Sequence, residues 1–385
     1  MTKSAHVDTF ARDLLPPPDT WPVMDFASIP ELSYPGRLNC AGELVDKWVN
    51  SGAAHRVAIY FPGGRWTYRE LMENANRIAH VLVDDLGIVP GNRVLLRGYN
   101  GPMMAACWLA VLKAGGICVT TMPLLRSREL AYVCEKAQIA VALCDHRLQT
   151  ELETASLTAT CLTTRISFGG DEEGTLDEMM RGKPAQFTNV DTAADDLAMI
   201  AFTSGTTGQA KGTMQFHRDI LAACDCFPVH VLKPSQHDIF CGSPPLAFTY
   251  GLGGVLLFPL RAGASTILLE QATPPHLLQG IQDFHATVCF TAPTAYRAMA
   301  SMAEDFDISS LKKCVSAGEH LPKATFEKWR EATGIKIIDG IGSTEMFHMF
   351  ISSSGEDIRP GATGRVVRGY RAKIVDDDGH ELPVG

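Results

Sequence analysis

The chain has 385 residues, of which 46% are hydrophobic and 20% charged, and its formal net charge is −9. These values exclude a disordered or fibrous protein, and the lack of a long basic run argues against a nucleic-acid partner. The longest apolar run, 103–112, is shorter than the roughly 18 residues of a membrane span. No secretion signal opens the chain, and its 11 cysteines form no C-x-x-C pair, so we expect a cytoplasmic protein with reduced thiols.

The first part of the chain alternates apolar strands with helices. Strands are predicted at 56–60, 93–96, 117–121 and 139–144. The segment 66–71 leads into a helix that is predicted to extend to residue 83, and further helices are predicted at 102–112 and 127–136. This order predicts a parallel sheet covered by helices. The polar, turn-rich segment 169–195 predicts a connection to a second unit.

The second unit repeats the alternation. Its strands are predicted at 197–202, 238–241, 265–269, 287–290, 313–316 and 336–338, and its helices at 275–284 and 323–332. Beyond residue 357, strands at 370–375 and 380–383 predict a hairpin around the turn 376–379. The predicted fold is therefore α/β, with two doubly wound, mainly parallel sheets in domains 1–170 and 190–357 and the truncated start of a β-rich subdomain at 358–385.

A glycine-rich loop, Thr203 to Gly212, directly follows the apolar strand 197–202. Its glycines allow the backbone to approach a ligand closely, while its hydroxyls, amides and Lys211 can bind phosphate oxygens. Two residues separate Gly205 from Gly208, so the loop is not a Walker A motif. The alternative is a flexible surface loop. The predicted phosphate ligands are Thr203, Ser204, Gly205, Thr206, Thr207 and Gly208.

A second glycine-containing segment, Asp339 to Glu345, follows the strand 336–338. Its glycines leave room for a flat ligand at the carboxyl end of a strand, where α/β sheets usually bind ligands. Thr344 can bond a phosphate, and the Glu345 carboxylate can hold Mg²⁺ beside it. Taken alone, the segment could equally be a plain turn.

Together these segments resemble the adenylate-forming superfamily, which includes acyl-CoA synthetases, aryl-CoA ligases, peptide-synthetase adenylation domains and luciferases. Its loop pattern, [Ser/Thr]-Ser-Gly-[Ser/Thr]-Thr-Gly-x-x-Lys-Gly, matches Thr203–Gly212 throughout. Its [Tyr/Ile]-Gly-x-Thr-Glu motif matches Ile341–Glu345, and its [Ala/Gly]-Gly-Glu segment matches Ala317–Glu319. The resemblance extends from about Leu38 to Gly385.

The resemblance implies a role for each motif. The loop and Lys211 handle the ATP phosphates, Asp339, Gly340 and Ile341 surround the adenine, and Gly318 and Glu319 lie beside it. Thr344 contacts the α-phosphate, and Glu345 binds Mg²⁺. The implied acid-binding residues are Phe248, Tyr250, Gly251, Ala317, Gly342 and His348. A lone histidine such as His348 could equally be a core residue.

The segments 248–253 and 340–350 look most like those of benzoate-type and 2-aminobenzoate-type CoA ligases. Residues 247–250 lack the carboxylate with which amino-acid-activating members bind the substrate ammonium, so an uncharged aromatic acid is favoured. The expected activity is the ATP- and Mg²⁺-dependent formation of an acyl-AMP, followed by thioester formation with CoA.

Two alternatives stay open: an aryl adenylation enzyme that loads a carrier protein, and a non-catalytic nucleotide-binding module. The identity of the acid and a possible homodimer also stay open. Family members continue past Gly385 with a ribose-binding aspartate, a hinge and a mobile C-terminal domain that carries a catalytic lysine. We therefore expect this chain to be an N-terminal part that binds an acyl-adenylate but forms it slowly.

Overall fold

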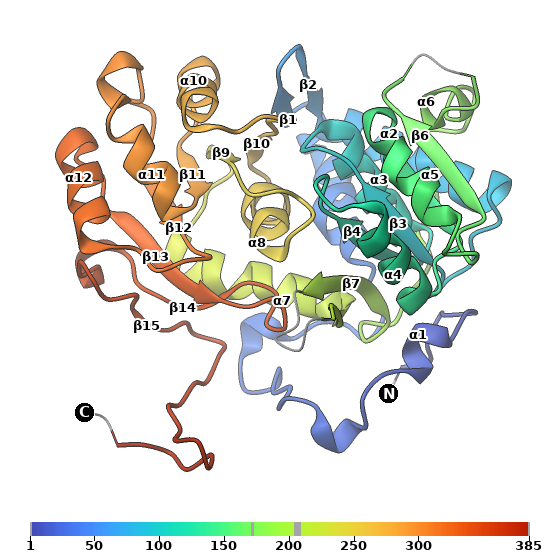
Figure 1. Ribbon diagram of the computed structural model, residues 1–385, viewed down its shortest axis with the longest axis horizontal. Helices are drawn as coiled ribbons and strands as arrows, with labels where there is room; N and C mark the ends of the chain where they lie inside the picture. The colour runs from blue at the N-terminus through green and yellow to red at the C-terminus, as the bar shows by residue number, and fades with distance from the viewer. Residues whose placement is uncertain (1, 171–172, 204–208, 384–385) are drawn as a thin grey trace.

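A computed structural model describes residues 2–170, 173–203 and 209–383, which form two mainly parallel β-sheets (Figure 1). The smaller sheet has the strand order β6-β5-β3-β4-β7-β8. Its strands, in that order, are Thr164–Phe168, Val141–Asp145, Arg93–Arg97, Ile117–Thr121, Leu197–Thr203 and Lys211–Phe216. All neighbours in it are parallel except β7 and β8, which form an antiparallel pair.

The larger, nine-stranded sheet has the order β15-β14-β13-β12-β11-β9-β10-β1-β2. Its strands, in that order, are Arg365–Val366, Met349–Ser352, Ile337–Gly342, Lys313–Ser316, Val288–Thr291, Ile239–Gly242, Ser265–Ile267, Val57–Phe61 and Gly64–Thr67. The six central strands are parallel, and β2, β14 and β15 pair antiparallel at the two ends. The predicted α/β class with two mainly parallel sheets is confirmed.

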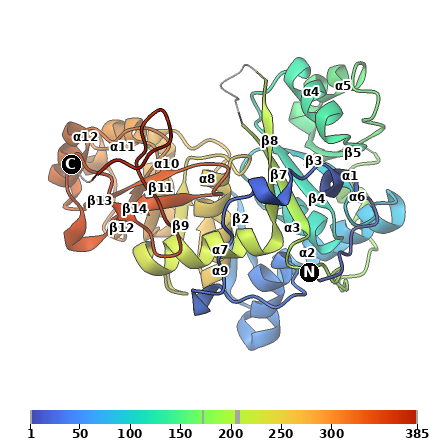
Figure 2. The ribbon, with the colours of Figure 1, turned by 90° about the horizontal axis from the view of Figure 1, so that it is seen from below.

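Helices form three layers around and between the sheets. The apolar side chains of α2 (Tyr68–His80), α3 (Pro102–Lys113), α7 (His217–Phe227) and α9 (Phe258–Ala262) share one core between the two sheets. Helices α4 (Ser127–Ala137) and α5 (Gln149–Ser156) cover the outer face of the six-stranded sheet. Helices α10 (Pro274–Phe284), α11 (Pro293–Met299) and α12 (Lys323–Thr333) cover the outer face of the other sheet. Figure 2 shows α7 lying across the middle of the molecule.

Shorter helical segments complete the chain. The short α-helices are α1 (Phe10–Asp13), α6 (Leu176–Met179) and α8 (Thr249–Gly251), and π-helical turns occur at Gly42–Asp46, Val49–Ala53, Val81–Asp85, Pro228–Leu232 and Leu252–Leu257. Turns of 3₁₀ helix lie at Pro18–Thr20, Pro30–Leu32, His146–Leu148, Ala303–Asp305 and Gly355–Asp357. No helix in the described part of the chain combines the length and apolar character needed to cross a membrane.

The division of the chain between the sheets differs from the predicted one. The strand predicted at 56–60, observed as β1, was expected in the first unit, but β1 pairs with β10 in the nine-stranded sheet, with Ile59 opposite Thr266. The strand predicted at 197–202, observed as β7, was expected in the second unit, yet it pairs with β4 of the six-stranded sheet. Apolar patterns identify strands but not their partners, which long-range packing decides. As a result, the two motifs of the predicted site come from different sheets.

The predicted C-terminal hairpin is reduced to a single bridge. Val375 lies opposite Glu381, and the Asp376 N–H donates to the His380 carbonyl at 2.9 Å, but neither flank forms a strand. Nearly all side chains from 371 to 383 are exposed. An isolated hairpin without a buried face is marginal in water, so the alternating pattern alone is insufficient here.

The N-terminal segment, residues 5–21, packs against one edge of the six-stranded sheet. Its attachment point is the buried carboxylate of Asp196, which accepts the Ala5 N–H at 2.9 Å and pairs with Arg12 at 3.2 Å. The ring of Trp21 then packs on Phe216 of β8, with centroids 5.5 Å apart. This segment therefore covers part of the strand that follows the glycine-rich loop.

Candidate active site

The glycine-rich loop connects the two antiparallel strands β7 and β8. Thr203, at the end of β7, lies opposite Lys211, at the start of β8. The hydroxyl of Tyr132 on α4 donates to the Ala210 carbonyl at 2.9 Å and so fixes the returning side of the loop. Ser204, Gly205, Thr206, Thr207 and Gly208 lie outside the described residues. The hairpin holds Thr203 and the exposed Lys211 side by side at its end.

The side chain of Gln215 attaches the turn that carries Thr344 and Glu345 to this hairpin. Gln215 on β8 donates from its amide nitrogen to the Thr344 carbonyl at 3.0 Å and to the Glu345 carbonyl at 3.2 Å. The turn lies between β13 and β14 of the nine-stranded sheet, whereas β8 belongs to the other sheet. Gln215 therefore connects the two motifs across the sheets.

Lys211 and Glu345 line the same cavity, which has a volume of about 560 Å³. The Glu345 side chain is exposed and makes no hydrogen bond or ion pair with any residue that the structure describes. A carboxylate in that condition is the kind of hard oxygen ligand that Mg²⁺ prefers. The residues present therefore fit a metal beside the phosphate loop, with Glu345 as the candidate ligand.

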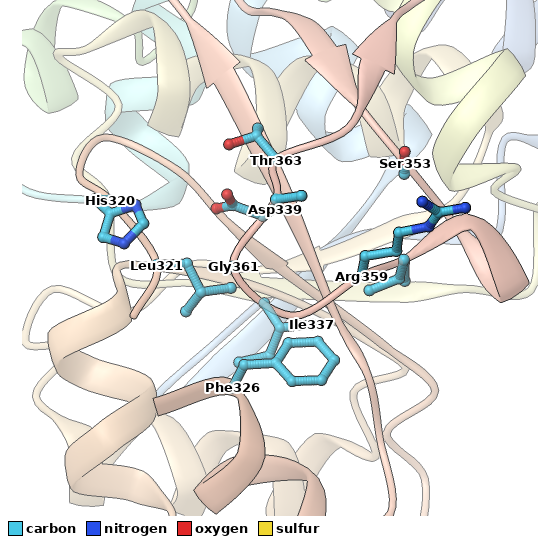
Figure 3. Close-up of a pocket in the computed structure, with 11 residues that line it drawn as sticks. His320, Leu321, Phe326, Ile337, Asp339, Ser353, Arg359, Gly361 and Thr363 are labelled. Atoms are coloured by element: carbon cyan, nitrogen blue, oxygen red, sulfur yellow. The ribbon is translucent and has the colours of Figure 1, made fainter. Parts of the chain in front are cut away.

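Asp339 lies at the edge of a smaller cavity between β13 and the segment 358–363 (Figure 3). Burial raises the pKa of its carboxyl group, while the Thr363 hydroxyl and the Gly340 N–H beside it act in the opposite direction. Its Oδ1 atom is buried and has no hydrogen-bond partner among the described residues. A buried acceptor without a donor is costly, and the amino group of an adenine would supply that donor.

Four of the predicted acid-binding residues lie close together. The Tyr250 hydroxyl donates to the Val315 carbonyl at 3.2 Å, beside Ala317. The Tyr250 and His348 rings lie 5.5 Å apart, and the backbone at Gly342 approaches the His348 carbonyl so closely that a Cβ would lie 2.7 Å from it. The structure brings these residues together from α8, β12, β13 and the turn before β14.

His348 is only 3% exposed. Its Nε2 lies 3.3 Å from the Tyr250 carbonyl, and its ring packs on Phe258, with centroids 4.5 Å apart. Burial lowers the pKa of His348 to about 3, so the ring is neutral at pH 7. This burial agrees with the core-residue alternative, and a contact between His348 and an acid stays a prediction.

Phe248 lies apart from this group. Its ring is 44% exposed and lines a second cavity, of about 600 Å³, together with Thr203, Ala210 and Tyr132. The cavity begins at Thr121, the carboxyl end of β4, and extends to Arg128 on α4. It therefore lies on the side of the hairpin that faces the helices of the six-stranded sheet.

The remaining predicted residues have mixed surroundings. Gly340 has no room for a side chain, because a Cβ there would lie 2.0 Å from the Met349 sulfur. Ile341 is exposed, and Gly318 has a φ of +89° that favours glycine. Glu319 accepts the Thr294 N–H at 3.2 Å at the start of α11. The part that these residues take in nucleotide binding stays a prediction.

Gly251 has no room for a side chain, because a Cβ there would lie 2.1 Å from the Pro245 carbonyl oxygen and 2.6 Å from that of Pro244. We expect Gly251→Ala to destabilise the fold by about 1–3 kcal/mol, because backbone atoms would have to move. Urea unfolding would measure this. The matched control is Gly280→Ala in α10, where the nearest atom is the end of the Leu269 side chain. An equal loss in both variants would contradict the expectation.

Two residues of the site were not predicted from the sequence. Gln215 and Tyr132 bind backbone carbonyls of the two motifs without belonging to either. The sequence offered one indication for Gln215, an amide between Met214 and Phe216 directly after the phosphate loop. Nothing comparable distinguished Tyr132 from other tyrosines.

Two mainly parallel sheets, with a phosphate-loop hairpin from one and an acidic turn from the other, define a nucleotide-binding enzyme of the adenylate-forming class. The family model for the AMP-binding enzyme matches residues 45–385, and the chain belongs to that family. The family expected from the sequence motifs is thereby confirmed.

Curated relatives of the chain in this family include aryl-CoA ligases. It is 30% identical to a benzoate–CoA ligase from Thauera aromatica over 92% of this chain and 68% of the relative. It is also 30% identical to an anthranilate–CoA ligase from Pseudomonas aeruginosa, over 81% of this chain and 59% of the relative. The chain thus spans about three fifths to two thirds of the length of these relatives.

Solved structures agree. The fold matches the crystal structure of the anthranilate CoA ligase AuaEII in complex with anthranoyl-AMP, with a TM-score of 0.88 and 32% identity over 93% of this chain and 70% of that one. It also matches a benzoate CoA ligase from Burkholderia xenovorans, with a TM-score of 0.83 and 28% identity over 90% and 70% of the two chains.

Proposed function

We propose that this chain provides the nucleotide- and acid-binding part of an enzyme that activates an aromatic carboxylic acid, of the benzoate or 2-aminobenzoate type, as its acyl-AMP. In this proposal the intact enzyme then transfers the acyl group to CoA. The observation that carries the proposal is that Lys211 and Glu345, which come from different sheets, line one cavity. The names of the relatives support the same chemistry.

In the proposed reaction, a carboxylate oxygen forms a bond to the α-phosphorus of ATP, and the bond from that phosphorus to pyrophosphate breaks. Two anions must meet, so the site must supply positive charge and fix the geometry. Lys211 would bind the phosphates, and the Asp339 carboxylate would accept a hydrogen bond from the adenine amino group. Mg²⁺ held by Glu345 would neutralise phosphate charge when bound. No protein nucleophile is needed.

The surroundings of Tyr250 favour an aromatic acid. The Tyr250 ring and the neutral His348 ring lie next to Phe290 and Phe258, and such rings offer flat, apolar contacts. An amino-acid substrate would need a carboxylate for its ammonium group, and residues 247–250 provide none.

The second cavity would give the acceptor thiol access to the acyl-AMP. It reaches from the exposed Arg128 on α4 to Phe248 beside the hairpin. A cation at the opening suits an acceptor that carries phosphate. In the transfer, the thiol sulfur would bond to the acyl carbon and AMP would leave.

Binding of non-hydrolysable acyl-AMP analogues tests the proposal on the chain itself. We expect benzoyl- and 2-aminobenzoyl-sulfamoyladenosine to bind at least about 100-fold more tightly than AMP, since both halves of the analogue gain contacts. Isothermal titration calorimetry would give the affinities, and an aliphatic octanoyl analogue serves as the control for the acid class.

Each outcome has a distinct meaning. Binding no tighter than that of AMP would support the alternative of a nucleotide-binding module. Preference for the octanoyl analogue would contradict the aromatic class. Incubation of the extended protein with acid, ATP and either CoA or a phosphopantetheinylated carrier protein would decide between the two acceptors.

A further inference from the structure

We propose that Gln215 is a positioning residue, which holds the turn carrying Glu345 at a fixed place relative to the phosphate-loop hairpin. The inference rests on the proposed function, because it assigns to Gln215 the alignment of the metal ligand with the phosphate site. Gln215 itself would touch neither nucleotide nor metal, and it would act through the backbone of Thr344 and Glu345.

Among the residues that the structure describes, the Gln215 side chain donates hydrogen bonds to this turn only. Its side chain, 4% exposed, donates to two successive carbonyl oxygens, those of Thr344 and Glu345. One amide group thereby holds two successive peptide units, those on either side of the Glu345 Cα. The Glu345 side chain has no partner among the described residues. These backbone contacts therefore help to set the position of the Glu345 Cα, from which the carboxylate extends.

The strand that carries Gln215 also carries Lys211. Residues 211, 213 and 215 alternate with 212, 214 and 216 along β8, so Lys211 and Gln215 extend from the same face of the strand, roughly 13 Å apart along it. Both residues and Glu345 line the same cavity. A rigid strand with the phosphate-binding lysine at one end and the anchor of the metal turn further along sets the spacing between the two.

This arrangement makes Gln215 more than a packing residue. The turn belongs to the nine-stranded sheet and the hairpin to the six-stranded sheet, so a shift between the sheets would separate the metal ligand from the phosphates. Residues that orient metal ligands from outside the coordination sphere typically change metal affinity about 10- to 100-fold when they are replaced. An effect of that size is expected here.

The test replaces Gln215 with residues of similar size that lack its amide donor. Gln215→Met removes both hydrogen bonds, and Gln215→Glu replaces the amide donor with a carboxylate that repels the two carbonyls. In calorimetric titrations of the chain with ATP, we expect each variant to lose about tenfold or more in affinity in the presence of Mg²⁺. In EDTA the affinity should change less than about twofold. Gln279→Met, at an exposed glutamine of α10 outside this cavity, is the matched control and should match the wild type in both conditions.

The comparison between titrations with Mg²⁺ and with EDTA distinguishes misplacement of the metal ligand from a general loss of protein stability. Equal losses with Mg²⁺ and with EDTA would overturn the inference, as would unchanged affinity in a folded variant. Should Gln215→Met fail to fold by circular dichroism, Gln215→Glu, which has nearly the same shape, carries the test. If the wild-type chain binds ATP with no effect of Mg²⁺, the proposed function itself fails at this site, an outcome that differs from a failure of the variants alone.

Discussion

Replacing Glu345 with glutamine is expected to remove the effect of Mg²⁺ on ATP binding. The substitution keeps the size of the side chain and its exposed position on the cavity, but it removes the negative charge that a divalent cation requires. Loss of a charged ligand opposite a polyphosphate costs several kcal/mol, so the affinity for Mg·ATP should fall by about 100-fold or more. Calorimetric titration with and without EDTA measures the change.

Two further variants define what the Glu345 result means. Glu356→Gln removes an exposed carboxylate that pairs with Lys336 at 3.3 Å, and it should leave ATP binding unchanged. Lys211→Ala removes a cation that acts on phosphate directly, so it should weaken binding with and without metal. If Glu345→Gln kept its response to Mg²⁺, Glu345 would not be the metal ligand.

The sequence predicted most elements of the fold because they depend on local patterns. The strand at 93–97 has the apolar centre Val94–Leu96, and the helix at 102–113 is apolar from Met103 to Leu112. Turn residues bound both runs, so the local pattern is enough to predict them. Strand β8 was not predicted, since its alternation of Lys211, Thr213 and Gln215 with small or apolar residues is only partly apolar. It forms because β7 offers a partner across the loop.

The candidate site was predictable where a motif lies within one segment. The segments Thr203–Gly212 and Ile341–Glu345 each match a family motif within a short stretch of chain, so the resemblance can be recognised without a structure. What joins them could not be predicted, because Gln215 makes its contacts across 129 and 130 residues of chain. Contacts of that range depend on how the two sheets pack, which a residue pattern does not encode.

Acid should destabilise this fold as the pH falls below about 6.5, because the buried histidines His217 and His348 are held in neutral form. Burial lowers the pKa of both His217 and His348 to about 3, whereas an unfolded histidine has a pKa of about 6.5. His217 accepts the Cys40 N–H at 3.2 Å through Nδ1, so a proton on that atom would displace the hydrogen bond.

The sign and size of the effect follow from proton linkage. Between pH 6.5 and pH 3 the unfolded chain binds these protons and the folded chain does not, so stability is fully present above pH 6.5 and is lost as the pH falls. At pH 5.0 each histidine costs about 2 kcal/mol, or about 4 kcal/mol together. Burial also raises the pKa of Asp219 to about 6. Protonation of Asp219 therefore favours the folded state and offsets about 1 kcal/mol of the loss in stability at pH 5.0.

Urea unfolding at pH 7.5 and pH 5.0 would measure the net loss, expected to be about 3 kcal/mol. In His348→Gln the loss should shrink by about 2 kcal/mol, because glutamine does not titrate and keeps a donor for the Tyr250 carbonyl. His237→Gln, at an exposed histidine, is the control and should show the wild-type loss. Equal stability of the wild type at the two pH values would mean that the histidines become solvated without unfolding, and that the aromatic core around His348 opens to water.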